Sequence, residues 1–285
     1  MDGFYGLLAA SFAACLVLAG IHCYLGLHVV LRGVIFVDLA LAQIAALGGA
    51  VALLSGHEPG SVAAFGYSLA FTFVGAAVFA LGRFRDERIP QEAVIGITYA
   101  VASAVAVLIL DRSVHGQEEI KAMLLGSILF VGWAEVGKTF ALYLAVGAVH
   151  FFLRKPFLEI STDVNAARAS GRIIWFWDLV FYATFGLVVT SSVAIAGVLL
   201  VFTLLVVPAA CAMLFLDRIM PRLLAGWSLG FLGCSAGLFL SVRGDLPTGP
   251  AIVAVFGLLL AIGAAGRYLG CKLSLFTRKN PGERQ

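Results

Sequence analysis

The stretch IAGVLLVFTLLVVPAACAMLF, residues 195–215, decides what kind of protein this chain is. It contains no charged residue, and it is as long as the roughly 20 apolar residues that an α-helix needs to cross a bilayer. A helix that is apolar on every side is typical of a buried or membrane-spanning position. Pro208 removes one backbone hydrogen bond from this helix, so we predict a kink at that residue.

Composition places the whole chain in the same class. Of its 285 residues, 61% are hydrophobic and only 12% are charged, and the mean hydropathy is +1.03. A soluble domain carries about 25% charged residues, so this chain has too little polar surface to cover itself in water. We therefore predict an all-α, polytopic membrane helix bundle that forms a single transmembrane domain over residues 1–285.

Apolar runs divide the chain into about eight or nine membrane-spanning helices. The first run has no basic segment before it and is long enough to span, so we do not expect a cleavable signal peptide. Only TSSVAIAG, residues 190–197, separates the sixth and seventh runs, and these two could form one broken helix with a re-entrant piece. The stretch 122–131 is too short to span, which favours a short interfacial or re-entrant helix. The candidate runs are roughly 4–30, 34–54, 61–82, 91–110, 134–153, 175–193, 195–216, 221–241 and 249–270.

Positive charge predicts the orientation, since Lys and Arg concentrate on the cytoplasmic side of membrane proteins. With the N-terminus outside and nine spans, all but four of the 19 Lys and Arg residues lie on the cytoplasmic side, including those of a basic tail at 271–285. The same arrangement predicts a cytoplasmic C-terminus. The net charge of +3 is explained by this location and needs no nucleic-acid partner. The four basic residues outside are Arg112, Lys121, Lys138 and Arg243.

The stretch GWAEVGKT, residues 132–139, matches the phosphate-binding loop pattern G-x-x-x-x-G-K-[ST]. A working loop of this kind follows a buried strand in a soluble sheet domain and needs a later carboxylate for Mg²⁺. Here the motif lies between apolar runs of a membrane protein, and the charge pattern places it outside. We therefore predict that it binds no nucleotide and that Lys138 extends toward the outer interface.

The longest polar stretch between spans is RKPFLEISTDVNAARASGRIIWFWD, residues 154–178. Thr162 or the serine before it can cap a helix whose first turn holds Asp163, and Gly171 suits the position just past its end. We predict a short helix within 159–172 that lies on the cytoplasmic surface. Such a helix can fill the groove of a partner protein, and the alternative is a solvated amphipathic loop.

Several stretches together resemble the permease subunits of bacterial ATP-binding-cassette (ABC) importers for divalent metals, the zinc/manganese/iron permease family. The most specific is IAGVLLVFTLLVVPAACAMLF, which is similar to a family helix of the form GxLLxxxLLxxPAAxA. VVLRGVIFVDLALAQIAALGGAVAL (29–53) and QEAVIGITYAVASAVAVLIL (91–110) resemble two other helices of the family. DVNAARASG, residues 163–171, falls where the family has the coupling helix that contacts the ATPase.

The resemblance implies a permease that catalyses no reaction itself and works as a homodimer in the bacterial inner membrane. It also implies separate ATPase chains that bind and hydrolyse ATP, and an extracytoplasmic binding protein that delivers the metal. A divalent ion (zinc, manganese or iron) is then the cargo, and this chain holds no catalytic cofactor. The residues expected to dock the ATPase are Thr162, Asp163, Val164, Asn165, Ala166, Ala167, Arg168 and Gly171.

One departure from the family concerns the second span. The family usually has an Asp, three residues and then a His there, and these side chains are taken to contact the metal. Aligned on Gly48, the two positions hold Leu39 and Gln43, and Asp38 is displaced by one residue, a rotation of about 100° on a helix. A Gln amide is a weaker ligand for Zn²⁺ than a His nitrogen. This favours transport of a transient, hydrated or chelated ion over a tight site for the bare ion.

Ionisable residues inside a span are commonly functional, which makes several side chains candidates for the metal pathway. Asp38 is the first of them, and a cap near the interface is its competing interpretation. Glu92 lies in the first turn of the fourth span, where favourable interaction with the helix dipole is the alternative. His22 lies in the first span, and His57 lies at the outer mouth, where it could receive metal from a delivery protein.

Two further polar residues have structural interpretations. Asp178 follows the aromatic stretch WFW at the start of the sixth span, where we expect it to cap the helix. His150 lies near the inner end of the fifth span, where we expect its ring to extend toward the interface.

Other functions fit the sequence less well. An ion-coupled secondary carrier often shows inverted repeats with paired broken helices, and no clear repeat is visible. An intramembrane enzyme would need a convergent set of residues such as H-E-x-x-H, which the sequence lacks. The nearest alternative keeps the ABC importer and changes its cargo to a metal chelate, such as a siderophore or haem.

Overall fold

The computed structural model describes residues 2–82, 90–112, 121 and 123–279, and every regular element in that part of the chain is a helix. This confirms the predicted all-α class. The helices in chain order are α1 (Asp2–Arg32), α2 (Val37–Leu54), α3 (Val62–Leu81), α4 (Gln91–Leu110), the 3₁₀ turn η1 (Ile128–Phe130), α6 (Trp133–Phe152), α7 (Arg154–Thr162), α8 (Val164–Ala169), α9 (Ile174–Phe215), α10 (Ile219–Gly244) and α11 (Thr248–Lys279).

Among the described residues, seven helices are long and apolar enough to cross a membrane, namely α1, α2, α3, α4, α9, α10 and α11. Helices α6 and α7 meet at a 75° bend, and this pair brings the number of candidate spans to eight. The multi-pass membrane protein expected from composition is therefore confirmed. The number differs from the nine apolar runs because α9 extends through both the sixth and the seventh run. Their connection, residues 190–197, contains a break, which agrees with the broken helix that the sequence allowed for these two runs.

Helix α9 is interrupted at Gly197, whose φ of 75° and ψ of 160° lie outside helical geometry. Only glycine adopts such a backbone without strain. A Cβ at this position would also lie 2.6 Å from the carbonyl carbon of Leu125, because the segment 123–127 passes the break at backbone distance. The break divides α9 into a first arm, residues 174–196, and a second arm, residues 198–215.

The kink that we predicted at Pro208 is a different feature from the break at Gly197 and stays a prediction. Pro208 lies in the second arm, within the stretch that the structure assigns as helical, and the non-helical residue inside α9 is Gly197. A proline removes a single hydrogen bond and keeps a helical φ, so a packed helix can continue through it. A positive φ takes the chain out of the helix altogether, and here a close backbone neighbour requires it.

Close contacts at glycines hold the bundle together. A Cβ at Gly48 of α2 would lie 2.7 Å from the carbonyl oxygen of Tyr67 in α3. A Cβ at Gly237 of α10 would lie 2.5 Å from the Cα of Ile252 in α11. Small residues at such crossings let helices approach closely in lipid, where packing replaces the hydrophobic effect as the cause of association.

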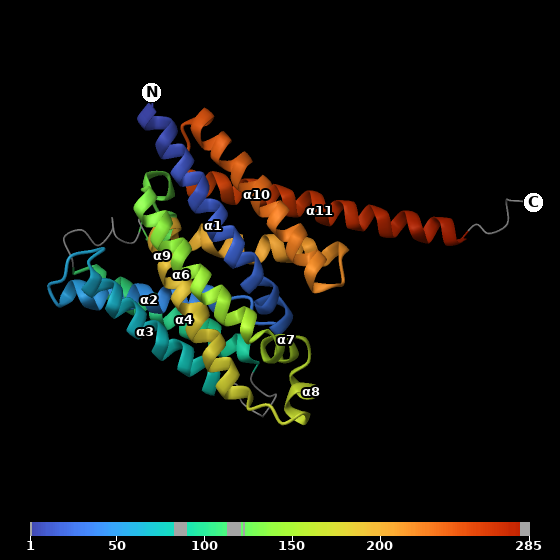
Figure 1. Ribbon diagram of the computed structural model, residues 1–285, viewed down its shortest axis with the longest axis horizontal. Helices are drawn as coiled ribbons and strands as arrows, with labels where there is room; N and C mark the ends of the chain where they lie inside the picture. Colours follow the sequence, from blue (N-terminus) through green and yellow to red (C-terminus); the bar gives the residue numbers. More distant parts are fainter. Residues whose placement is uncertain (1, 83–89, 113–120, 122, 280–285) are drawn as a thin grey trace, which may run out of the picture.

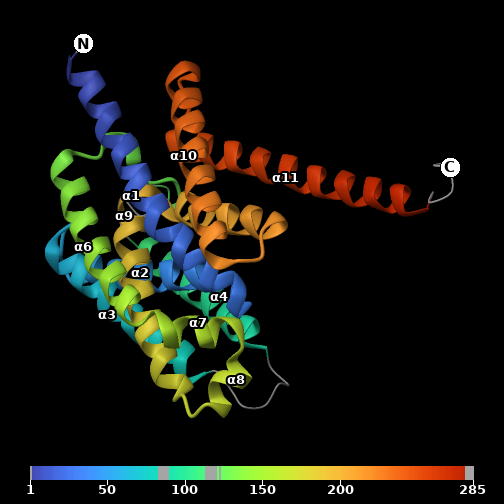
Figure 2. The same cartoon turned by 45° about the vertical axis from the view of Figure 1, so that its right-hand side comes forward.

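Both views separate several groups of helices (Figure 1, Figure 2). Helices α2, α3 and α4 lie together beside the first arm of α9, and α1 and α6 pack against that arm on another side. The short helices α7 and α8 lie at one end of the bundle. Helix α10 returns along α1, and the C-terminal part of α11 extends away from the other helices.

Candidate functional site

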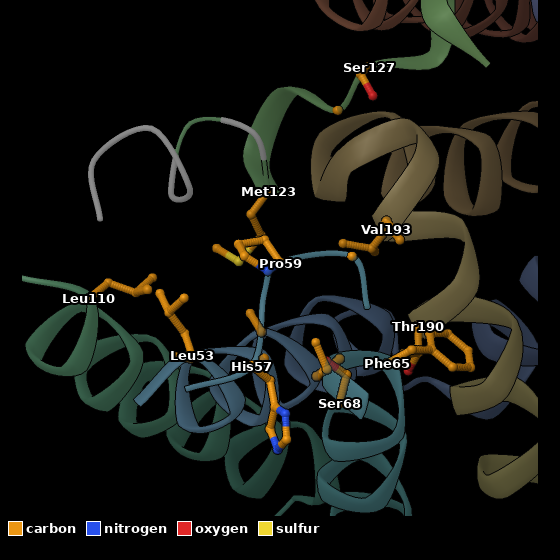
Figure 3. A pocket seen from close by; sticks show the side chains of 18 residues that line it. Leu53, His57, Pro59, Phe65, Ser68, Leu110, Met123, Ser127, Thr190 and Val193 are labelled. Carbon is orange, nitrogen blue, oxygen red and sulfur yellow. The ribbon is translucent and has the colours of Figure 1, made fainter. Parts of the chain in front are cut away.

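A cavity of about 350 Å³ lies between α2, α3, the first arm of α9 and the segment 123–127. The connection between α2 and α3 contributes His57 and Pro59 to its wall, and α9 contributes Thr190 and Val193 (Figure 3). The cavity therefore lies beside the break at Gly197.

Most of the cavity wall is apolar, and hydroxyl groups supply much of its polar chemistry. Ser68 of α3 and Thr190 of α9 line the cavity. Thr190 Oγ1 lies 2.9 Å from Thr72 Oγ1, and the Thr72 hydroxyl donates to the carbonyl oxygen of Ser68 at 2.8 Å. Sequence reasoning missed these residues, because Ser and Thr inside spans commonly bond to their own helix and no spacing marks those that face a cavity.

The break in α9 adds backbone groups at the edge of the cavity. The Ser127 amide donates to the carbonyl oxygen of Ile195 at 3.1 Å, one of the contacts that replace helical hydrogen bonds there. Irregular backbone at membrane depth is tolerated where protein or a water-filled cavity satisfies it. Transporters commonly bind ions with the carbonyl groups that such a break frees.

Asp38 and Gln43 lie along α2, toward its N-terminus from the part that lines the cavity. Both are buried, at 2% and 4% exposure. Seven residues make about two helical turns, so Asp38 shares a helix face with Ala45 and Gln43 shares one with Ala50. Both alanines line the cavity. Asp38 and Gln43 are therefore not part of the cavity wall, but they continue the two edges of the α2 face that forms it.

Glu92 of α4 lies at the beginning of α2. Its Oε1 accepts a hydrogen bond at 3.2 Å from the amide of Phe36, which is the N-cap residue of α2. Its Oε2 is buried and has no hydrogen-bond partner in the described part of the chain. Since Asp38 lies in the first turn of the same helix, two carboxylates gather near the positive end of the α2 dipole.

The two histidine candidates lie in different parts of the helix bundle. His57 lines the cavity, and its ring lies 5.6 Å from the ring of Tyr67. His22 is fully buried between α1 and α6, where its Nδ1 donates to the carbonyl oxygen of Leu18 at 2.8 Å and its ring lies 6.2 Å from that of Tyr143. His22 therefore belongs to the packing around α1 and not to the cavity wall.

Two structural interpretations made from the sequence are wrong. His150 does not extend to the interface, because it is 1% exposed and its ring packs 4.6 Å from the ring of Phe157. Asp178 does not cap α9; its Oδ1 accepts a hydrogen bond from Arg32 at 2.7 Å, and both side chains are fully buried. The partner of Asp178 lies 146 positions away, and His150 Nε2 also lies 2.8 Å from Thr184 Oγ1, 34 positions away, so local pattern does not reveal these contacts.

A tight metal site of protein ligands is not formed by the residues that the structure describes, because no three His, Cys, Asp or Glu side chains meet there. The groups near the cavity are mainly hydroxyl, amide, carboxylate and carbonyl oxygens. Such hard donors suit Mn²⁺, Mg²⁺ and Ca²⁺ better than soft ions. Weak binding by few ligands also lets an ion leave again, as conduction requires.

The stretch GWAEVGKT begins a helix and does not form a loop. Gly132 is the N-cap of α6, and Gly137 and Lys138 lie within the helix. The Gly132 amide donates to the Glu135 side chain at 3.3 Å, as in a capping box. Phosphate-binding loops direct several free amides at the ligand, whereas the amides beyond the first turn of α6 are used inside the helix. The backbone geometry of a phosphate loop is thus absent from these described residues.

The predicted short helix after the bend is α8, and Asp163 is its cap. Asp163 Oδ1 accepts hydrogen bonds from the amides of Asn165 and Ala166, each at 2.9 Å. Thr162, which the sequence allowed as the cap, ends α7 instead, where its hydroxyl donates to the Leu158 carbonyl oxygen at 2.8 Å. Asp163 takes the role because it has the extended backbone that an N-cap requires.

Contacts on both sides hold α8 in place. Gly171 has a φ of 83° just past the end of the helix, as the sequence predicted for that position. Arg172 Nε pairs with Glu159 Oε2 of α7 at 2.8 Å. Ala167 is buried, and the other α8 side chains are half-buried or exposed. Most of the surface of α8 is therefore exposed or half-buried, while the helix itself is held in place by the contacts at its ends.

A model of the ABC 3 transport family matches residues 4–266, which include all but the ends of the helical bundle. The chain belongs to the ABC 3 transport family. The resemblance to ABC metal permeases that was stated from the sequence is thereby confirmed.

Relatives of this ABC 3 family member include membrane proteins of manganese transport systems. It is 25% identical to MntC of Halalkalibacterium halodurans over 254 residues, which cover 86% of this chain and 82% of that protein. It is 27% identical to MntD of Bacillus subtilis, covering 86% and 87% of the two chains. Both are named manganese transport system membrane proteins.

Solved structures share the fold of this ABC 3 family member. PsaBC from Streptococcus pneumoniae, in complex with a Fab, matches with a TM-score of 0.75 at 21% identity and covers 90% of both chains. An inward-facing conformation of a metal-chelate type ABC transporter matches with a TM-score of 0.66 at 19% identity, covering 92% and 96%. At these identities the likeness shows a common fold.

Proposed function

We propose that this ABC 3 family member is the transmembrane permease subunit of an ABC importer that moves a divalent transition metal into the cytoplasm. The observation that carries the proposal is the cavity between α2, α3 and the broken helix α9. A helix break beside a cavity is where membrane transporters commonly bind their cargo. Relatives named for manganese transport support a metal as that cargo.

Manganese is the cargo that the residues favour over zinc. The proposed route runs from His57 at the outer mouth, through the cavity, to Asp38 and Gln43 on α2 and to Glu92 at its beginning. The last three residues offer oxygen donors, which Mn²⁺ accepts readily, whereas Zn²⁺ prefers nitrogen and sulfur. The position where the family usually has a His holds Gln43 here, which removes a nitrogen ligand.

Energy comes from a partner in this proposal, since the chain itself hydrolyses no ATP. The ATPase docks on the surface made by the end of α7, by α8 and by the turn after it. The exposed or half-buried residues of that surface are Thr162, Asp163, Val164, Asn165, Ala166, Arg168 and Gly171. Ala167 is 3% exposed, so it packs against the rest of the permease and does not face the ATPase.

The complete machine in this proposal contains two copies of the permease, the ATPase and an extracytoplasmic binding protein that delivers the ion. It lies in a bacterial inner membrane, surrounded by lipid, with its C-terminus in the cytoplasm. The apolar side chains that α11 leaves exposed include Leu258, Ile262 and Leu269, as expected for a helix covered by lipid or by a second copy.

Reconstitution tests the proposal directly. The purified permease is placed in liposomes with a candidate ATPase and the binding protein, and uptake of radioactive Mn²⁺ is measured together with ATP hydrolysis. We expect uptake that depends on ATP and on the ATPase, and Asp38→Asn should lower it. Ser235→Ala on α10 is the control, because the Ser235 hydroxyl donates to the Phe231 carbonyl oxygen of its own helix. Mn²⁺ uptake by the permease without any ATPase would reject the proposal.

A metal chelate is the second candidate cargo. The mostly apolar cavity wall favours it, and no carboxylate is among the described residues that line the cavity. A cavity of about 350 Å³ also has room for more than a bare ion. Competition in the same liposomes distinguishes the two: excess ferric siderophore should leave Mn²⁺ uptake unchanged if the ion is the cargo, and should be accumulated itself if the chelate is.

A further inference from the structure

A buried polar cluster joins α1, α7 and α9 outside the cavity wall, and the transport route proposed above does not use it. Arg32 of α1 pairs with Asp178 of α9 at 2.7 Å, and both side chains are fully buried. The guanidinium carbon of Arg32 lies 3.9 Å from the centre of the Phe181 ring. We name this cluster the Arg32 junction; its members are His28, Arg32, Ser161, Asp178 and Phe181.

Ser161 is the point at which α7 enters the junction. Its hydroxyl donates to the Phe157 carbonyl oxygen at 2.7 Å and accepts from Arg32 Nε at 2.8 Å. His28 Nδ1 lies 2.8 Å from the same oxygen. A hydroxyl has one proton and two lone pairs, so His28 must be the donor in this contact. The Ser161 hydroxyl thus uses all of its hydrogen-bonding capacity, and one oxygen atom fixes α7 to α1.

Packing of the helices alone does not require a buried, hydrogen-bonded ion pair. Burying an ion pair costs desolvation energy, and apolar residues of similar size commonly give equal or better stability. What a hydrogen-bonded ion pair supplies in exchange is a single defined geometry between the elements that it joins. Charged residues within a membrane protein are for this reason functional candidates.

The Arg32 junction lies between α8, the proposed docking helix, and the first arm of α9, which lines the cavity. Ser161 is followed within two residues by Asp163, the cap of α8, and α8 is the proposed docking helix. On its other side the junction holds Asp178, near the start of the first arm of α9. That arm runs on to the cavity and ends at the break at Gly197. A displacement of α8 therefore reaches the cavity through α7, the junction and α9.

Resting on the proposed function, we propose that Arg32 and Ser161 are positioning residues that make α7, α1 and the first arm of α9 move as one body. When the ATPase displaces α8, the junction passes the movement to the helix that lines the cavity. Neither residue touches the cargo. Loss of the junction therefore uncouples ATP hydrolysis from transport without removing the docking surface.

The test compares Ser161→Ala with the wild-type chain in the reconstituted complex. Three quantities are measured: the amount of ATPase bound, the rate of ATP hydrolysis and the amount of Mn²⁺ moved per ATP. We expect equal ATPase binding and continued hydrolysis, with about 2- to 30-fold less Mn²⁺ per ATP, the range found for substitutions that change coupling. Ser161→Thr keeps the hydroxyl and should restore the ratio. Ser235→Ala, the same change on α10, should leave it unchanged.

Hydrogen exchange of the isolated permease gives a second readout that needs no ATPase. We expect faster exchange in 154–169 for Ser161→Ala, with no change in 219–244. An unchanged ratio of Mn²⁺ to ATP in Ser161→Ala would overturn the inference while leaving the proposed function intact. A loss of ATPase binding or of insertion, with no recovery in Ser161→Thr, would also overturn it. A wild-type chain that moves neither Mn²⁺ nor another divalent transition metal with the ATPase and the binding protein would refute the proposed function, and the inference with it.

Discussion

At the scale of single residues, Gly197 controls the shape of the site. Its φ of 75° takes α9 out of helical geometry beside the cavity, and the segment 123–127 fills the space that a side chain would need. Both constraints come from the backbone, so no other residue satisfies them. Gly137 is different, because it lies within α6 and, in the described part of the chain, a Cβ there meets no atom within 4 Å beyond the backbone of its own helix.

Gly197→Ala should destabilise the folded permease by at least about 1–3 kcal/mol, the cost of a strained backbone alone. Gly137→Ala is the matched control and should be neutral or stabilising by up to about 1 kcal/mol, since glycine weakens a helix. The unfolding midpoint in detergent measures both. Equal midpoints for the two variants would contradict the assigned role of Gly197.

Gln43 is the residue that we expect to set the preference among metals. Gln43→His adds a nitrogen ligand, so uptake of Zn²⁺ relative to Mn²⁺ should rise roughly tenfold, which corresponds to about 1.4 kcal/mol of added affinity. Uptake assays with both ions present measure the ratio. Gln43→Asn keeps an amide and controls for the change in size; a ratio that stays the same in Gln43→His would remove this residue from the route.

At the scale of elements, a buried ion pair joins α1 to α9 beside the contacts that Ser161 of α7 makes with α1. Arg32 and Asp178 are 146 positions apart in the sequence. Their helices, α1 and α9, meet beside α7, to which the docking helix α8 is attached. Breaking such a pair leaves one charge buried without its partner, which is costlier than replacing both. Stability and coupling should therefore respond differently to single and double substitutions.

Asp178→Ala should destabilise the permease by about 3–5 kcal/mol, because Arg32 stays buried as an uncompensated charge. The double variant Arg32→Leu with Asp178→Leu should recover much of that loss, yet keep the low Mn²⁺ per ATP expected of a broken junction. Unfolding in detergent and the reconstituted transport assay measure the two effects. Full recovery of both stability and coupling in the double variant would contradict the positioning role of Arg32.

At the scale of the whole molecule, the orientation in the membrane decides which end faces the ATPase. The charge pattern predicts that α7 and α8 face the cytoplasm and that the α2–α3 connection faces outward. The figures place these two segments at separate parts of the bundle, with α7 and α8 at one end (Figure 1). The proposed route from His57 toward Asp38 follows α2 from the outer to the inner side.

Labelling with a membrane-impermeant maleimide tests that orientation in intact cells, in a chain whose five native cysteines are replaced. Glu58→Cys, in the α2–α3 connection, should react from outside. Arg168→Cys, on the exposed part of α8, should react only after the membrane is opened. The reverse result would place the docking segment outside and exclude the proposed contact with a cytoplasmic ATPase.

The sequence by itself determined the class of protein, most of the spans and the presence of a short helix within 159–172, although its cap is Asp163 and not Thr162 or the serine before it. These features depend on local composition and on the bilayer as solvent, which requires long apolar helices and satisfied backbone groups. Asp38 and Gln43 became candidates through the resemblance of their helix to the permease family, and their place on the transport route stays a prediction.

Only the tertiary structure decided which residue of 190–197 breaks α9, which hydroxyls line the cavity and what Asp178 and His150 contact. Pro208 is a local cause of bending, but the break at Gly197 requires the backbone of 123–127 to pass beside it. Thr190 and Ser68 line the same cavity because α3 and α9 meet there. Arg32 pairs with Asp178, which lies far along the chain. Each of these is a contact between distant segments, and local sequence pattern contains no information about which distant segments come together.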